Sequence, residues 1–452
     1  MRPPLPFPRA VTQIHGRTLP AEGTPAGYGA LIAAYNLAAP LPRMLFAIGA
    51  RHRIVERDGW KLLTPRHAPR ADLEGHLTFA FKYEGLDLGV LSALFSAIDP
   101  EAIETIVRAK PTGGYARRIW FLYEWLTGSV LDVPPLRRGS YVNALNPALQ
   151  YPGKAENAPR QRVRNNLPGT PAFCPLVFRT EAIERFVASG LAARAQAAFS
   201  KAPQNIRPML AGALAMAEIL PDESRPNRTF IDRWYCALSE PDCTATTADA
   251  IARLIGEDGM AEPAGPLLAG MRAFEKRAAS HLDPVLAAAC MAFGFASARK
   301  IRDPAEPVHR YVVTHTLGKR GFGPRKTVLP FAIIAADHPD EYKALLRVGP
   351  GDALFDATPH ASFLYRCLQV SAERFIPAVI SYILHYRRFL SAAAPLGLSE
   401  DAMAMLFERL RRSGGVLPYR LYAGRYPSLK PEHAPQIEYA FRRTAASDPA
   451  HC

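Results

Sequence analysis

The amino-acid sequence predicts a mostly α-helical protein. Of its 452 residues, 48% are hydrophobic and 21% are charged, a globular composition that can bury a sizeable core. Alanine-rich stretches carry apolar residues at helical spacing, most persistently over residues 180–394. The length is enough for two or three domains. We therefore expect helices packed on helices.

The first 64 residues predict an arm, a helix and a strand pair. Residues 1–25 begin with the Pro-rich MRPPLPFPRA and have no apolar stretch of a signal peptide, so we expect a flexible arm. A helical pattern begins near Tyr28. Residues 53–64 predict two short strands, because Asp58-Gly59 is a hairpin signal between apolar residues.

Three helices are predicted next. Residues 76–95 and 100–109 have helical apolar spacing, and Pro100 suits the first turn of the second helix. Residues 117–128, RRIWFLYEWLTG, predict an aromatic helix that ends at Gly128. Its aromatic side chains fit core packing, with a ligand or peptide groove as the alternative.

Residues 129–179 lack helical periodicity and are rich in Pro, Gly, Asn and Arg. We expect this segment to wrap neighbouring helices, with arginines facing carboxylates or helix C-termini. A phosphate site at Arg162 and Arg164 is an alternative, although no glycine-rich cradle accompanies them.

The C-terminal residues predict a small module. Ser399 is a helix N-cap, followed by acidic residues, a basic last turn and a Gly stop. The rest suggests a hairpin and a helix, which would suit a winged-helix shape. We expect four parts: a flexible arm, an α-rich N-terminal extension domain, a helical domain and the module, at residues 1–25, 26–180, 181–395 and 396–452.

Composition leaves several partners open. The net charge of +14 fits nucleic acid, an acidic partner or an anionic surface. The six cysteines form no CxxC pair, and we expect reduced, mostly buried thiols. The longest apolar stretch, 284–298, is short for a membrane span and predicts a core helix. These features favour a cytoplasmic protein without a membrane anchor.

Seven sequence blocks, in this order, resemble the large bacterial Fic (Fido-fold) proteins with a long N-terminal extension. The resemblance runs from about Tyr28 to the C-terminal module. It implies a Fido-type helical core, and family members typically transfer AMP from ATP to a hydroxyl of a target protein. The blocks are HLTFAFKYEG (76–85), PTGGYARRIWFLYEWLTG (111–128), RVRNNLPGTPAFCPLVFRT (162–180), ESRPNRTFIDRW (223–234), LDPVLAAACMAFGF (282–295), VHRYVVTHTLGKRGF (308–322) and FDATPHASFLYRCL (355–368).

The family motif, HxFx(D/E)GNGRxxR, has a physical logic. Its His takes the proton of the target hydroxyl, and its acidic residue holds Mg²⁺ at the phosphates. Its GNG lets backbone amides approach the phosphates at a helix N-terminus, and its arginines neutralise phosphate charge. ATP and Mg²⁺ are therefore the cofactors of any residual family activity.

In this chain the motif is degenerate. Laid on the sequence without a gap, it falls on residues 299–310, where Arg299 replaces the base and cannot act as one near neutral pH. Only Asp303, at the metal position, and Arg310, at the last position, match the motif. Alternatively, Asp303 is a turn or N-cap residue, and Arg310 forms an ion pair on the helix surface. The other altered positions include Ile301, Pro304, Ala305, Glu306 and Pro307.

Two further family features are altered. The family's substrate-holding flap would lie between 252–260 and 266–274, where AEPAG leaves no room for a hairpin. The inhibitory signature (S/T)xxxE(G/N) would fall on Glu218, Asp222 and Glu223, and it is broken. The sequence blocks of the helical framework thus persist, while the catalytic motif, the substrate-holding flap and the inhibitory signature are all altered.

Other candidates are weaker. His309 and His315 are expected on an amphipathic helix, in packing or solvent roles rather than as a base. The basic loop 318–326, GKRGFGPRK, does not match a phosphate-binding P-loop. No HExxH, GxSxG or zinc-spaced Cys/His set occurs.

Three functions follow as hypotheses. The first is an inactive Fic-family pseudoenzyme that needs no cofactor and binds or regulates a protein, such as an active Fic enzyme or a former target, with a dimer allowed. The second is an AMP or other phosphate-group transferase with altered chemistry, using the basic cluster of Lys300, Arg302, Arg310 and Arg299 for an anionic donor. The third is a DNA-binding regulator.

Overall fold

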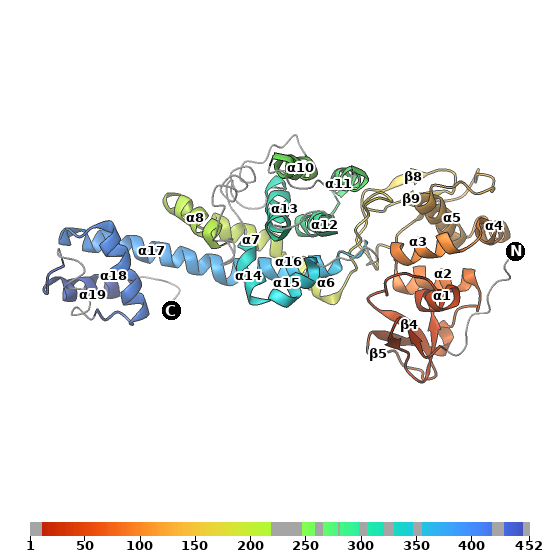
Figure 1. Ribbon diagram of the computed structural model, residues 1–452, viewed down its shortest axis with the longest axis horizontal. Helices are drawn as coiled ribbons and strands as arrows, with labels where there is room; N and C mark the ends of the chain where they lie inside the picture. Colours follow the sequence, from red (N-terminus) through yellow and green to blue (C-terminus); the bar gives the residue numbers. More distant parts are fainter. Residues whose placement is uncertain are drawn as a thin grey trace. The chain divides into compact units, whose positions relative to one another are not determined.

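Helices dominate the computed structural model, which confirms the mostly α-helical fold (Figure 1). The described residues are 11–217, 246–257, 265–278, 281–297, 305–320, 330–346, 355–417 and 429–445. The chain divides into two compact units. Unit 1 is Met1–Gly190, Phe230–Phe322 and Ala335–Arg366, and unit 2 is Leu191–Thr229, Gly323–Ile334 and Cys367–Cys452. The predicted bounds of the N-terminal extension, the helical domain and the C-terminal module stay predictions.

Unit 1 begins with short strands. A two-stranded sheet of β1 (Gln13–Ile14) and β2 (Arg17–Thr18) precedes a four-stranded sheet of order β3-β4-β6-β5. Its strands are β3 (Gly23–Ala26), β4 (Leu45–Gly49), β5 (Val55–Arg57) and β6 (Trp60–Leu63). β5 and β6 pair antiparallel across Asp58-Gly59, which confirms the predicted strand pair; both turn residues have a positive φ, 54° and 77°.

The predicted flexible arm is wrong from residue 13 onward. Ile14 is buried in the core, and β3 pairs with β4 along its whole length. The physical reason is long-range: the partner strand β4 begins at Leu45, far from the segment that it orders.

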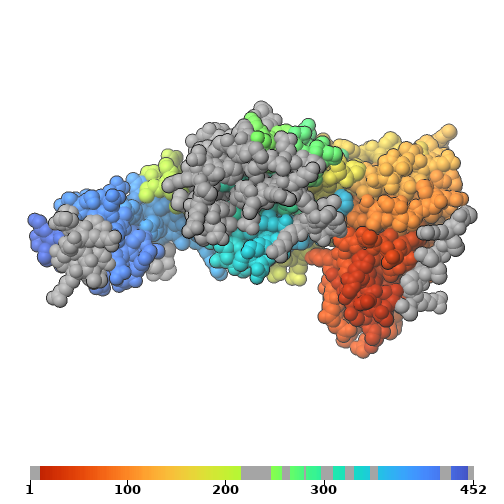
Figure 2. Space-filling view, viewed as in Figure 1, coloured from red at the N-terminus to blue at the C-terminus, as the bar shows by residue number. Residues whose placement is uncertain are grey.

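The helices that follow pack around the sheet into one continuous body, red to orange in Figure 2. They are α1 (Gly27–Tyr35), the 3₁₀ turn η1 (Pro65–His67), α2 (Leu73–Phe79), the π-helical turn η2 (Ala80–Glu84), α3 (Leu88–Ala97), α4 (Pro100–Ala109) and α5 (Gly114–Thr127). α4 begins at Pro100 and α5 is followed by Gly128 at φ 70°, both as predicted. Trp120 is fully buried, which confirms core packing of the aromatic helix.

The predicted helix 76–95 is divided in two. Gly85, at φ 87°, ends η2, and the chain turns before α3 begins. Buried polar groups fill this turn: the Tyr28 hydroxyl donates to the Gly85 carbonyl at 3.0 Å, and the Glu84 carboxylate accepts from the Tyr28 amide at 3.0 Å. Burial raises the pKa of Glu84 well above its usual value.

Residues 129–179 contain no helix, as predicted, but they form a three-stranded sheet of order β7-β9-β8. The strands are β7 (Val142–Asn143), β8 (Glu156–Ala158) and β9 (Val163–Asn165). The segment wraps the helical core as expected. Arg277 of α11 (Gly265–Ala278) bonds Glu156 at 2.6 Å and three backbone carbonyls of the segment.

The helical core of unit 1 surrounds α12 (Pro284–Ser297) and α13 (Ala305–Lys319), which pack along each other. The other helices of this part are α6 (Glu181–Ala188), α10 (Thr247–Glu257), α15 (Pro339–Leu346) and the first part of α16 (Thr358–Val370). α12 is buried almost throughout, which confirms the predicted core helix. α13 is buried on every side from His309 to Leu317, so its predicted amphipathic character is wrong.

Unit 2 holds the predicted C-terminal helix. α18 (Glu400–Arg412) is capped by Ser399, whose Oγ accepts from the Ala402 amide at 3.3 Å, as the sequence predicts. The predicted hairpin after α18 lies outside the described residues. The other elements are α7 (Leu191–Ser200), η3 (Gln204–Ile206), α8 (Arg207–Ala217), α14 (Phe331–Asp337), η5 (Ser371–Phe375), α17 (Ile376–Ala393), η6 (Ala394–Leu396) and α19 (His433–Ala445), with α14 and α16 crossing the unit boundary.

Two remaining predictions concern thiols and membranes. Cys174, Cys290 and Cys367 are buried and free, whereas the other cysteines lie outside the described residues. One described stretch, Thr358–Leu396, is long and apolar enough to cross a membrane by composition, with 33% of its most apolar window buried. Core helices pass the same test, so this stretch is weak evidence for a membrane protein.

Candidate functional site

The degenerate motif lies at the connection from α12 to α13. Arg299, Lys300, Ile301, Arg302, Asp303 and Pro304 fall outside the described residues. Ala305, Glu306 and Pro307 form the first turn of α13, and Arg310 follows one turn later. Sequence reasoning therefore placed the motif between two packed helices, and the description of the site begins at Ala305.

The first turn of α13 is a poor anion site. In an α-helix the first amides have no partner within the helix and can bind a phosphate. Pro307 has no N–H, so one of these donors is missing in the turn that begins at Ala305. The sequence adds Glu306, a carboxylate, to the same turn. Both changes disfavour a phosphate at this helix end.

Arg310 is fully buried, one of the largest side chains without exposed surface in the described residues. The neighbouring His309 is buried too, and its ring lies 5.7 Å from the ring of Tyr342 and 5.4 Å from that of His360. The His360 ring in turn meets Phe293 edge-on at 5.3 Å. These side chains come from α12, α13, α15 and α16, and they form a packed interior rather than an open site.

The two imidazoles in this interior are neutral at physiological pH. Burial is the main cause that lowers the pKa of His309 well below its usual value, and the nearby His360 and Arg310 lower it further. Burial lowers the pKa of His360 to about 3. A base needs access to the proton that it takes, and neither ring has exposed surface of any size. Packing is therefore the role that the geometry gives to His309.

His315 sits in a polar network further along α13. Its Nδ1 lies 3.2 Å from Thr247 Oγ1, and the Thr247 amide donates to Glu275 at 2.7 Å. Glu275 Oε1 also forms an ion pair with Lys319 Nζ at 3.0 Å. Burial, with Lys319 nearby, lowers the pKa of His315 to about 4. This network ties α10, α11 and α13 together, which is a structural task.

No group of three His, Cys, Asp or Glu side chains that could hold a metal occurs in the described ranges. Asp303, the predicted metal residue, lies outside them. The predicted inhibitory segment 218–228 does too, as does most of the basic loop 318–326. Only residues 258–264 separate α10 from α11, where the family's flap would lie.

Arg162 and Arg164 are on or beside β9. The Arg162 guanidinium lies 4.7 Å from the centre of the Tyr141 ring, and its Nε donates to the Gly139 carbonyl at 2.5 Å. Arg164 is exposed. Arg117, which is buried, donates to the Ser140 and Arg162 carbonyls at 2.7 and 3.3 Å. Arg162 and Arg117 thus hold loop carbonyls in place, and the phosphate role of Arg162 and Arg164 stays a prediction.

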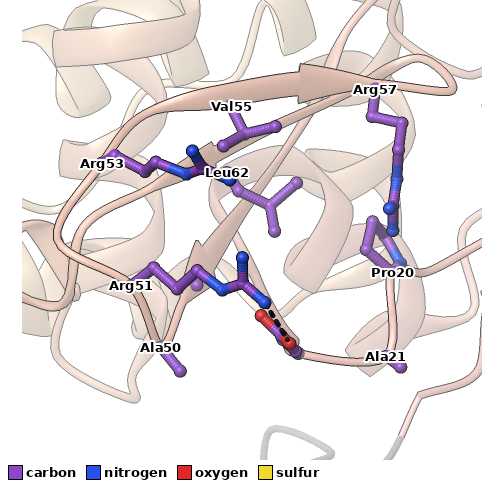
Figure 3. Close-up of a pocket in the computed structure, with 10 residues that line it drawn as sticks. Pro20, Ala21, Ala50, Arg51, Arg53, Val55, Arg57 and Leu62 are labelled. Atoms are coloured by element: carbon purple, nitrogen blue, oxygen red, sulfur yellow. Dashed lines mark hydrogen bonds and ion pairs between the residues drawn. The ribbon is translucent and has the colours of Figure 1, made fainter.

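A hollow of about 200 Å³ opens at one end of the four-stranded sheet (Figure 3). The arginines Arg51, Arg53 and Arg57 extend over it from different sides, and Val55 and Leu62 supply apolar surface. The remaining lining residues are Pro20, Ala21, Glu22, Gly49 and Ala50. Arg51 pairs with Glu22 at 3.2 Å, drawn as a dashed line in Figure 3.

Sequence reasoning missed this hollow, although a signal was present. In RHRIVER, residues 51–57, arginine or valine stands at every second position. In an extended segment such residues share one side of the strand. The predicted strand pair, residues 53–64, therefore already placed two guanidinium groups, those of Arg53 and Arg57, on one side of its first strand.

A second hollow, of about 430 Å³, lies in unit 2 between the end of α17 and α19. Pro395, Leu396, Pro435 and the exposed Tyr439 are among its lining residues. Its lining is largely apolar, and most of the lining residues belong to the predicted C-terminal module, residues 396–452.

Comparison with known proteins gives no match: no family model fits the chain, and no curated protein and no solved structure is detectably similar to it. The Fic resemblance therefore depends on the sequence blocks and the motif positions themselves.

Proposed function

We propose that the chain is a Fic-like protein that has lost its group-transfer chemistry and acts in the cytoplasm as a binding or regulatory partner of another protein. The observation that carries this proposal is the first turn of α13. Pro307 there removes an amide from the anion-binding helix end that the family uses, and Glu306 brings negative charge to it.

Two further observations support the proposal. Arg310, the last motif residue, is fully buried, so its guanidinium has no surface with which to meet a phosphate from solvent. Arg299 stands where the family has its base, and a guanidinium stays protonated near neutral pH. The helical framework around α12 and α13 is nevertheless well packed, as expected of a protein kept for binding rather than chemistry.

The partner is a protein in this proposal, either an active Fic enzyme or a former target of the ancestral activity. Because no chemistry is required, partner binding should not depend on the motif carboxylates. The variant Asp303→Ala/Glu306→Ala should therefore bind the same partner as the wild type.

The test is incubation with α-labelled ATP, GTP, CTP and UTP, each with Mg²⁺, in the presence of host-cell extract. We expect no label on any protein. Label that appears with the wild type and disappears with Asp303→Ala/Glu306→Ala would replace the proposal with an altered phosphate-group transferase. Label that also appears with the double variant would show a transferase activity that does not depend on these carboxylates, and it would likewise overturn the proposed loss of chemistry.

A further inference from the structure

The arginine-lined hollow at the end of the four-stranded sheet has no part in the chemistry considered so far. It lies at β4, β5 and β6, where Gly49, Val55 and Leu62 line it. Ala47 and Trp60, on the same face of the sheet, are buried in the hydrophobic core. A Cβ added at Gly49 would touch Leu62 Cδ2 at 3.4 Å. The floor is therefore apolar and close-packed, and the polar groups stand on the rim.

The rim is positively charged. Three arginines and one carboxylate line the hollow, which leaves a net charge of +2. Glu22 already pairs with Arg51. Arg57 lies 3.5 Å from Asp58, but both side chains are largely exposed, so this pair contributes little. No hydrogen bond or ion pair joins Arg53 to any described residue.

We propose that this hollow binds a phosphate monoester. Guanidinium groups bind phosphate through paired, charge-assisted hydrogen bonds. A phosphate monoester carries about −1.5 to −2 charges at neutral pH, which matches the rim better than the single charge of a carboxylate. The apolar floor of Val55 and Leu62 receives the carbon atoms next to the phosphate.

The size of the hollow restricts the ligand. Its volume of about 200 Å³ is below the roughly 300–1,000 Å³ of pockets that enclose a whole drug-sized molecule. It therefore takes a phosphate and a small organic group, on a small ester or on a phosphorylated side chain. The inference is independent of the proposed loss of chemistry at α12 and α13, since all of its residues lie in the strands of the N-terminal sheet or in the segments that flank these strands.

The experiment is calorimetric titration of the full chain with phenyl phosphate, with benzoate as the probe that has the same ring and a single charge. We expect phenyl phosphate to bind and benzoate to bind at least about tenfold more weakly. Arg53→Gln should weaken phenyl phosphate binding about tenfold, because it removes a charge-assisted hydrogen bond. Arg66→Gln, at an exposed arginine outside the hollow, is the matched control and should bind as the wild type does.

A second pair of variants tests the charge of the rim in the opposite direction. Glu22→Gln should tighten phenyl phosphate binding several-fold, since it removes the carboxylate and releases Arg51. Glu56→Gln makes the same charge change on a strand residue outside the hollow, next to Lys61, and should have no such effect.

A phosphotyrosine peptide with blocked termini, compared with phenyl phosphate, shows whether the bound phosphate belongs to a protein side chain or to a small ester. Tighter binding of the peptide indicates a phosphorylated side chain, and equal binding indicates a small ester. No binding of phenyl phosphate at millimolar concentration, equal binding of benzoate, or equal weakening by Arg66→Gln and Arg53→Gln would overturn the proposal.

Discussion

Replacing His360 with Phe should make the protein less sensitive to acid. The folded-state pKa of His360 is about 3, below the usual value of 6.5, because the ring is buried. Above pH 6.5 the ring is neutral in both the folded and the unfolded state. As the pH falls below 6.5, only the unfolded state gains the proton, so stability is lost between pH 6.5 and pH 3.

The size of the effect follows from this pKa difference. Each pH unit in that window costs about 1.4 kcal/mol, so His360 removes about 2 kcal/mol of the free energy of unfolding between pH 7 and pH 5. Asp87 acts in the opposite direction, because burial raises its pKa to about 6 and acid then favours its folded form. The wild type and the variant share Asp87, so it cancels in the comparison.

The assay is urea unfolding of the wild type and of His360→Phe at pH 7, 6 and 5. The aromatic replacement keeps the edge-on contact with Phe293 and removes the buried Nε2, which has no hydrogen-bond partner in the described residues. The pH-dependent loss should therefore shrink by about 2 kcal/mol in the variant. An unchanged loss, or an equal reduction in the control His338→Phe at an exposed position, would refute the reasoning.

Three substitutions test the packing by urea unfolding. Phe173→Ala should cost about 3–5 kcal/mol, because this buried ring fills the space that Gly294 leaves on α12, where an added Cβ would lie 2.8 Å from it; a loss below about 1 kcal/mol would contradict close packing there. Gly27→Ala should abolish stable folding, since φ is +57° and the new Cβ would lie 1.4 Å from Glu84 Oε1; a variant that unfolds like the wild type would show that Glu84 lies elsewhere. Arg277→Gln should cost about 2–3 kcal/mol through its lost charge-assisted bonds to the 154–167 segment, whereas an unchanged stability would show that the segment is held by other contacts.

The elements that the sequence predicted well are those with local signals. α4 begins with Pro100 after a capping aspartate, and α18 follows the cap Ser399; both helices lie where caps and periodicity place them. The β5–β6 pair follows from Asp58-Gly59, because both turn residues tolerate a positive φ.

The errors arose where distant residues decide the structure. The break at Gly85 depends on the Gln150 side chain, which accepts from the Leu86 amide at 2.8 Å across 64 positions of sequence. α13 has polar residues such as Thr314 and His315 at positions that mimic an exposed face. Thr247 and the packed neighbours bury that face, and no local pattern reveals them.

The candidate site could be predicted in part. The sequence placed the motif between α12 and α13, and the chemistry of Pro307 follows from residue type alone. The burial of Arg310 could not be predicted, because an arginine in a helix is usually exposed and only the surrounding helices decide otherwise.

Nucleotide binding by the wild-type chain is the most direct test of the proposed loss of chemistry. The measurement is the unfolding midpoint with ATP, GTP, CTP or UTP and Mg²⁺, with intact mass recorded on the same samples. A ligand that binds only the folded state must raise the midpoint. Because the hollow near β5 is proposed to bind phosphate esters, each nucleotide is also tested with Arg53→Gln. We predict no mass increase, and we predict that any rise in the midpoint is smaller in Arg53→Gln than in the wild type. A rise of equal size in both proteins, or a covalent nucleotide adduct, would contradict the account.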